Sequence, residues 1–191
     1  MASKDTTTRN DLTDVSAIDA AVLAGCRSGE RGARQCLYEL SHRQVYQLMV
    51  RMVGFQDAED VTQQVFLQVF HKIDQFAGHS KFETWLYRLA VNEALQHLRK
   101  ERRWKFRTLS RDPVSRHKPE EERDEHQELL QQALLRVEPE LRSIFVLREV
   151  EGLSYREIAE AIEIPEGTVG SRLNRARRDL QQHLADLGWK P

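Results

Sequence analysis

Apolar residues recur along most of the chain at intervals of three or four. The clearest stripe consists of Val61, Val65, Phe66, Val69, Phe70 and Ile73. Such spacing is typical of helices that bury one face. The same pattern, with the capping and breaking residues between its segments, predicts helices over residues 16–27, 30–52, 57–75, 83–98, 129–137, 140–150, 154–162 and 165–184. We therefore expect an all-α protein.

Two segments without apolar periodicity separate the helical parts of the chain. One is the polar N-terminus, and the other is a charged stretch around Pro119. A stretch with many charges and no apolar stripe is typical of a linker. The expected organisation is a disordered N-terminus at 1–15, a first helical domain at 16–104, a flexible linker at 105–127 and a second helical domain at 128–187.

The second domain carries the pattern of a helix-turn-helix. Ser154 and Glu157 can form a capping box at the start of a short helix, and Glu163 with Ile164 makes a tight turn before the next helix. That next helix is basic, which suits contacts to guanine and phosphate. Its candidate DNA-binding residues are Thr168, Ser171, Arg172, Arg175 and Arg178. A plain helical hairpin with a solvated basic face is the alternative interpretation.

Charge adds to this picture because it is unevenly distributed. The 191 residues carry 29 basic and 30 acidic side chains, for a formal net charge of −1. Residues 99–118 carry 9 basic and 2 acidic side chains, residues 119–168 carry 5 and 14, and residues 169–191 carry 5 and 2. Two basic islands therefore flank an acidic block, and such segregation favours the binding of polyanions at particular faces.

The first basic island also contains aromatic residues. Within residues 99–107, six side chains are basic, one is acidic and two are aromatic. Basic side chains neutralise phosphates, and aromatic rings stack on unpaired bases with about 1–3 kcal/mol each. The segment predicts contact with nucleic acid, although the helix dipole alone also favours cations at a helix end.

Several classes of function are disfavoured by the sequence. No apolar run reaches the roughly 18 residues of a membrane span, and the N-terminus has no signal-peptide layout, so we expect a cytoplasmic protein. Cys26 and Cys36 lack metal-ligand spacing and are expected to be ordinary reduced residues. A metal-dependent nuclease using Glu59, Asp60 and His71 is disfavoured, because the last two lie 11 positions apart on one helix, roughly 16 Å. We expect no catalytic residues, no bound metal and no cofactor.

Three segments in this order resemble the extracytoplasmic-function sigma factors. They read DAEDVTQQVF at 57–66, FAGHSKFETWLYRLAVN at 76–92, and GLSYREIA at 152–159 followed by PEGTVGSRLNRAR at 165–177. Members of this family are small transcription-initiation subunits of bacterial RNA polymerase that keep only conserved regions two and four. The resemblance covers nearly the whole chain, about residues 16–187.

The resemblance implies a role for each segment. The helix at 57–75 would dock on the clamp helices of core RNA polymerase, through Asp60, Gln63, Gln64 and Phe66. The loop after it and the following helix would read and melt the −10 element of the promoter, and the helix at 165–184 would read the −35 element in duplex DNA. The residues expected to contact the −10 element are His79, Ser80, Lys81, Trp85, Arg88, Asn92, Arg99, Lys100, Arg102 and Arg103. An anti-sigma factor is a further implied partner.

The chain departs from the family pattern at two positions. Glu163 stands where glycine often forms the turn of a helix-turn-helix, so we expect a slightly strained or differently shaped turn. Gly170 lies inside the recognition helix, where the family commonly carries Lys or Arg, and should lower helix stability by about 1 kcal/mol. A free-standing helix-turn-helix regulator, which binds duplex DNA without polymerase, would explain residues 129–187 but not the motifs in 57–104.

The acidic block suggests a further hypothesis about the free protein. Carboxylates of this block could restrain DNA binding until polymerase separates the two domains. The residues proposed for this effect are Glu120, Glu121, Glu122, Asp124 and Glu125. Neutralising them should then increase DNA binding by the free protein.

Overall fold

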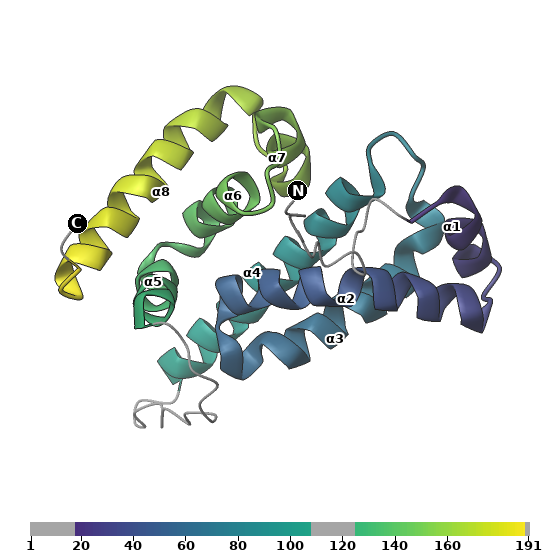
Figure 1. The fold of residues 1–191 in the computed structure, drawn as a ribbon, viewed down its shortest axis with the longest axis horizontal. Coiled ribbons are helices and arrows are strands. Elements are labelled where there is room, and N and C mark those ends of the chain that lie inside the picture. The colour runs from purple at the N-terminus through teal and green to yellow at the C-terminus, as the bar shows by residue number, and fades with distance from the viewer. Residues whose placement is uncertain (1–17, 108–124, 190–191) are drawn as a thin grey trace, which may run out of the picture.

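Helices account for all the regular secondary structure in the described part of the chain, which in this computed structural model comprises residues 18–107 and 125–189. This confirms the all-α prediction. The helices are α1 (Ala20–Arg27), α2 (Arg31–Val53), α3 (Phe55–Lys72), the short 3-10 helix η2 (Ile73–Gln75), α4 (Phe82–Arg107), α5 (Glu125–Arg136), α6 (Pro139–Glu149), α7 (Tyr155–Ile162) and α8 (Glu166–Asp186). Figure 1 shows α1 to α4 as one group of helices and α5 to α8 as a second group beside it.

The first domain packs α2, α3 and α4 around a shared apolar core. Leu48, Val65 and Leu86, one from each of these helices, are buried in it. The predicted apolar stripe of α3 faces this core and is buried, except for Phe70, which is partly buried. Helix α1 lies so close to α2 that a Cβ added to Gly25 would come within 2.6 Å of the Ala33 Cβ.

The second domain consists of α5 to α8, with a core of its own. Ile144, Ile158 and Leu173 come from α6, α7 and α8, and all three are fully buried. Pro139 is the first residue of α6, a position where its missing N–H is not needed and its fixed φ suits the helix. The domain therefore presents α7 and α8 as a short and a long helix joined by a tight turn.

Several helix boundaries differ from the sequence prediction. Helix α1 begins at Ala20, where the Asp19 carboxylate accepts from the Val22 N–H at 2.8 Å. Helix α3 begins at Phe55 rather than after an Asp57 cap, because Gly54 adopts a φ of 88° that ends α2 and allows α3 to start at once. Asp57 lies instead in the first turn of α3, where a carboxylate still suits the helix dipole.

Helices extend into both ends of the predicted linker. Helix α4 continues to Arg107, and α5 already begins at Glu125. The remaining part of the predicted linker and the predicted N-terminal segment at 1–15 lie outside the described residues. Of the residues proposed to restrain DNA binding, Glu125 alone lies in the described part, and it is exposed. Across the described ranges, no helix combines the length and the apolar character needed to cross a membrane.

The two domains are in direct contact. Helix α4 packs against α7, and α2 packs against α5 and α6. Gln131 of α5 donates to the Val50 carbonyl, over 2.6 Å, at the C-terminal end of α2. The buried guanidinium of Arg142 in α6 donates to the carbonyl of Met52 in α2, as well as to two carbonyls of its own domain. Because the last carbonyls of a helix lack partners within the helix, Arg142 gives the Met52 carbonyl a partner and places a positive charge at the end of α2.

Candidate nucleic-acid interface

A hollow opens between the segment that follows η2 and the first half of α4. Its volume is about 350 Å³, and its lining includes five residues that the sequence assigned to the −10 element. These residues are His79, Ser80, Trp85, Arg88 and Asn92. Gly78, with a φ of 74°, shapes the turn of the loop. The structure therefore brings half of the predicted −10 residues to one concave site.

An aromatic cluster holds the loop over the start of α4. The rings of Phe76, Phe82 and Trp85 lie 5.5–5.6 Å apart, centroid to centroid, a distance at which aromatic pairs attract. The Arg27 guanidinium also donates to the Phe76 carbonyl at 2.6 Å. Trp85 is thus both a support of the loop and a wall of the hollow, because it is only partly buried.

The hollow has the chemistry to accept an unpaired base. The indole ring of Trp85 offers a stacking surface, and the amide of Asn92 can both donate and accept hydrogen bonds. Arg88 adds a fixed positive charge next to this wall. A base leaving a duplex loses stacking and pairing, and a site with these groups can replace both.

The remaining predicted −10 residues extend away from the hollow along α4. Arg99, Lys100, Arg102 and Arg103 are all exposed. Trp104, which follows them, is 65% exposed. A large exposed aromatic ring beside four cations suits the backbone and the bases of nucleic acid. The basic segment of α4 is therefore a surface feature rather than part of a core.

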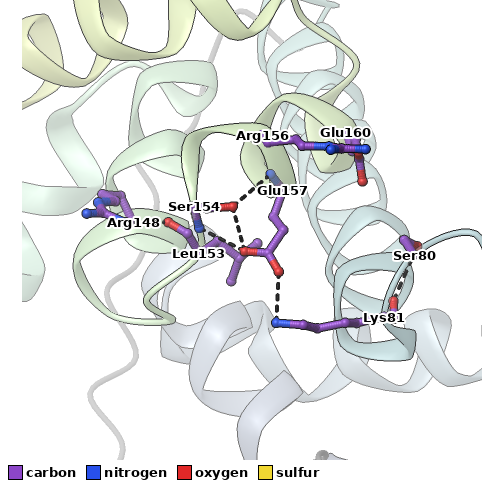
Figure 2. Close-up of polar contacts among 8 residues, drawn as sticks. All are labelled: Ser80, Lys81, Arg148, Leu153, Ser154, Arg156, Glu157 and Glu160. Atoms are coloured by element: carbon purple, nitrogen blue, oxygen red, sulfur yellow. Dashed lines mark hydrogen bonds and ion pairs between the residues drawn. The ribbon is translucent and has the colours of Figure 1, made fainter.

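The helix-turn-helix forms as the capping pattern predicts. The Ser154 hydroxyl oxygen accepts from the Glu157 N–H at 3.2 Å, and the Glu157 carboxylate accepts from the Ser154 N–H at 2.9 Å (Figure 2). Glu163 adopts a left-handed conformation with a φ of 57°, so the turn follows the same path that glycine would allow. A residue with a Cβ is disfavoured in this conformation, so the turn keeps the shape that glycine allows and strain stays the expectation for this position.

The recognition helix α8 carries its predicted residues on an open surface. Ser171, Arg172, Arg175 and Arg178 are exposed, and Thr168 is partly exposed. Arg175 lies 3.8 Å from a Glu138 carboxylate oxygen and 3.9 Å from one of Asp179, which are loose contacts between exposed groups. A Cβ added to Gly170 would meet the Tyr155 ring at 3.5 Å, an ordinary van der Waals distance. The absence of a side chain at Gly170 is therefore not required by crowding.

The predicted polymerase-binding residues on α3 differ in exposure. Asp60, Gln63 and Gln64 are exposed. Phe66 is only 3% exposed and lies 4.7 Å from the Tyr38 ring, so its side chain belongs to the core. Leu67, which is 61% exposed, extends the polar face with an apolar group. Sequence reasoning missed this residue, although its position outside the 3-4 stripe is the signal that could have identified it.

A polar network between the domains was also missed. Tyr87 of α4 is buried and donates its hydroxyl hydrogen to a Glu151 carboxylate oxygen at 2.7 Å, while Gln44 of α2 donates to the Tyr87 oxygen. Burial and the adjacent carboxylate raise the pKa of Tyr87, so the phenol stays neutral. The signal available in the sequence is weak: a tyrosine on the buried face of a helix needs a partner for its hydroxyl.

One group of side chains has the composition of a metal site. Within the described ranges, Asp57, His97 and Glu101 place one ligand atom each within 4.8 Å of one another. His97 Nε2 and Asp57 Oδ2 are 3.1 Å apart and bring α3 and α4 together at this point. The two carboxylates and the imidazole have the chemistry to hold a divalent cation, but their approach alone is no evidence of one.

Comparison with protein families locates two conserved regions in the chain. The family model described as Sigma-70 region 2 matches residues 37–104, and the model described as Sigma-70 region 4 matches residues 127–180. The first range includes the hollow and the exposed residues of α3. The second includes α7, the turn and α8 as far as Leu180.

Curated relatives match the chain over most of its length. The ECF RNA polymerase sigma-E factor of Haemophilus influenzae is 32% identical over 185 residues, which cover 88% of this chain and 96% of that protein. The ECF RNA polymerase sigma factor SigW of Bacillus subtilis is 31% identical over 175 residues, covering 84% and 94%. The RNA polymerase sigma-H factor of Pseudomonas aeruginosa is 32% identical over 183 residues, covering 88% and 95%.

Solved structures share the fold. The sigma factor RpoE from Bartonella quintana, solved in complex with the anti-sigma factor NepR, has a TM-score of 0.66 and 24% identity, covering 78% of this chain and 94% of that one. CnrH, solved in complex with the cytosolic domain of CnrY, has a TM-score of 0.61 and 22% identity, covering 89% and 99%.

Proposed function

The chain belongs to the ECF sigma factors of bacterial RNA polymerase, and on this basis we propose that it binds the core enzyme, recognises the −10 and −35 promoter elements and promotes DNA opening. Sigma factors act by binding and by strand separation, and the proposal includes no covalent chemistry by this chain. Its place of action is the cytoplasm, where polymerase and promoter DNA meet.

The observation that carries this proposal is the hollow beside α4. Residues from a loop and from two turns of a helix, which the sequence assigned to −10 recognition, surround one space of about 350 Å³. We propose that a base of the melted −10 element enters this space, stacks near Trp85 and bonds to Asn92. The basic surface from Arg99 to Arg103 then follows the strand backbone.

The other two surfaces complete the proposal. The exposed residues Asp60, Gln63 and Gln64 of α3 dock on core polymerase, and Leu67 adds an apolar contact to the same face. Helix α8 enters the major groove of the −35 element and presents Arg172 and Arg175 to bases or phosphates. An anti-sigma factor is a proposed partner, since RpoE of Bartonella quintana, which shares this fold, was solved with the anti-sigma factor NepR.

Reconstitution with core RNA polymerase tests this function. The chain should co-purify with the core enzyme, and the complex should select promoters from a randomised duplex library and start transcription on them. A chain that binds duplex DNA but neither binds the core enzyme nor supports initiation would instead be a free-standing regulator. That result would overturn the proposal.

The hollow is tested within the same assay by two substitutions on α4. Asn92→Ala removes a lining side chain and should lower the yield of open complex about tenfold, the effect of one lost base contact. Gln96→Ala removes another exposed polar side chain one turn further along the helix, outside the hollow, and should leave the yield unchanged. Equal yields for the two variants would remove the hollow from the −10 assignment.

A further inference from the structure

The backbone of the loop at residues 76–81 is bonded to the first helix of the chain. Arg27, in the last turn of α1, donates from its guanidinium to the Phe76 carbonyl over 2.6 Å, across 49 positions of the sequence. Helix α1 also packs against η2, which ends where this loop begins. Figure 1 shows α1 at the end of the first domain that lies away from α5 and α8. A separate element therefore holds the point at which the loop leaves η2.

Phe76 is held from two sides. Its ring packs against the rings of Phe82 and Trp85 in α4, with 5.5 Å between centroids in both pairs, and its side chain is only 8% exposed. Its carbonyl faces Arg27 of α1. The four residues that follow, 77–80, all line the hollow. The position of Phe76 thus sets where this part of the wall begins.

The other hydrogen bonds of the loop, within the part of the chain that the structure describes, are local. The Phe76 N–H donates to the Ile73 carbonyl at 3.2 Å, and the Lys81 carbonyl accepts from the Ser80 hydroxyl and the Trp85 N–H, both at 3.3 Å. These bonds shape the two ends of the loop without tying its backbone to a distant element. The ion pair of the Lys81 ammonium with the second domain holds a side chain rather than the backbone.

Helix α1 is itself firmly placed, so it gives Arg27 a fixed base. The Cβ of Ala33 lies 2.6 Å from where a Cβ on Gly25 would be, Cys26 is fully buried, and Val22 and Leu23 pack partly buried against the core. The range matched by the Sigma-70 region 2 model begins at residue 37, so it includes the loop but not α1. The contact therefore adds to the site a helix that lies before the matched region.

A direct contact with DNA is the alternative role for this arginine. The residue is exposed, and a cation at the end of a helix also suits the helix dipole. An arginine that bound a phosphate itself would strengthen binding to every sequence equally. An arginine that holds the loop would instead affect how well the hollow distinguishes one base from another. The two roles therefore predict different results.

We propose that Arg27 is a positioning residue for −10 recognition, which holds the Phe76 carbonyl so that residues 77–80 form the wall of the hollow before DNA arrives. This inference rests on the proposed function, since it concerns the same hollow. A loop that is ordered in advance loses less conformational entropy when the base enters. Helix α1 is thereby a part of the −10 site that contacts no base.

Limited proteolysis of the free chain tests whether Arg27 holds the loop. Arg27→Met removes the donor and keeps an unbranched apolar side chain. Arg31→Met, at the exposed first residue of α2, is the matched control, because it removes the same charge and also one tryptic site. Trypsin cleaves segments that are released from the fold, so cleavage after Lys81, followed by mass spectrometry, should be about fivefold faster in Arg27→Met than in the control.

Base discrimination by the polymerase complex tests the consequence for recognition. The measured quantity is the ratio of affinities for a single-stranded oligonucleotide of the selected −10 sequence and for a scrambled one. Arg27→Met should lower this ratio about fivefold, mainly through weaker binding of the selected sequence, and Arg31→Met should leave it unchanged. Arg27→Lys keeps a cationic donor and should give an intermediate ratio. Partial unfolding would lower both affinities equally, so it would leave the ratio unmoved.

Two results would overturn the proposal. One is equal cleavage after Lys81 in Arg27→Met and Arg31→Met, and the other is an equal loss of affinity for both oligonucleotides in Arg27→Met, which would make the arginine a phosphate contact. The proposed function fails on a different result, a wild-type chain that neither binds core polymerase nor supports initiation. In that case proteolysis of the free chain still decides whether Arg27 holds the loop.

Discussion

Tyr87 and Glu151 lie 64 residues apart in the chain and meet at the domain contact, where the phenol donates to the carboxylate at 2.7 Å. The tyrosine is buried, and Gln44 completes the network from α2. A hydrogen bond from a neutral donor to a charged acceptor in a partly buried site is among the stronger polar contacts in a protein. This bond therefore contributes to the relative placement of the domains.

Tyr87→Phe should reduce the free energy of unfolding by about 1–2 kcal/mol. The ring still packs, but the Glu151 carboxylate loses its hydroxyl donor and keeps the Gln44 amide at 3.2 Å. Urea unfolding of the full chain measures the change. Glu151→Gln and the double variant complete a thermodynamic cycle, and a coupling energy near zero would show that the bond does not contribute.

The close approach of α1 and α2 predicts a large effect of a small substitution. In Gly25→Ala, the new methyl group would lie 2.6 Å from the Ala33 Cβ, so the helices must move apart and the free energy of unfolding should fall by about 1–3 kcal/mol. Gly32→Ala, also at the start of the chain, is the matched control. Nothing lies within 4 Å of the new methyl group there, and an alanine in α2 should raise stability by up to about 1 kcal/mol. Thermal unfolding that ranked the two variants in the opposite order would contradict this packing.

Substitution of Arg175 distinguishes a base contact from a phosphate contact with the −35 element. Arg175→Ala should weaken binding of the polymerase complex to its selected promoters by about 1–3 kcal/mol if the guanidinium reads a base. Binding to promoters altered at that base should then be affected much less. A uniform loss on every sequence would make the residue a phosphate contact. Arg136→Ala, at the exposed end of α5, is the control and should bind normally.

Glu157 gives the stability of the chain a defined pH dependence. Its bonds from Ser154 and then the Lys81 ammonium lower the pKa of this carboxyl from 4.5 to about 2. Because the folded pKa lies below the unfolded value, the charged form stabilises the protein above about pH 4.5, and this contribution is lost as the pH falls toward about 2.

The difference in unfolding free energy between the wild type and Glu157→Gln isolates this effect. Glutamine can still accept from Ser154 but has no charge for Lys81. The difference should stay constant from neutral pH to about 5 and then shrink as the carboxyl protonates. Urea unfolding over this range measures it, and a difference that grew on acidification would contradict the assigned pKa direction.

Local patterns predicted the helices and the helix-turn-helix well, because both depend on neighbours in sequence. The stripe from Val61 to Ile73 is buried as its spacing indicates, and the capping box of Ser154 and Glu157 forms. The predicted start of α3 is wrong. Asp57 is a good capping residue, but Gly54 adopts a positive φ and lets the helix begin at Phe55. Asp57 instead pairs with His97 on α4.

The contact between the domains could not be predicted in the same way. It depends on residues that lie far apart in sequence, such as Tyr87 and Glu151, and no periodic pattern relates them. The acidic block between the basic islands did suggest an electrostatic restraint. In the described part of the chain, the carboxylates that contact the first domain include Glu140, Glu151, Glu157 and Glu163. Four of the residues that the hypothesis named, from Glu120 to Asp124, lie outside that part.

The left-handed turn at Glu163 affects both the folding of the DNA-binding motif and the contact with the first domain. A glycine here would relax the backbone by about 1 kcal/mol and make the DNA-binding motif easier to fold, but it would have no carboxylate to reach Arg88. The glutamate thus makes the turn less favourable than glycine would, but it provides the carboxylate that bonds to Arg88 of the first domain. Among relatives, a glycine at this position should accompany the loss of the contact to the residue that corresponds to Arg88.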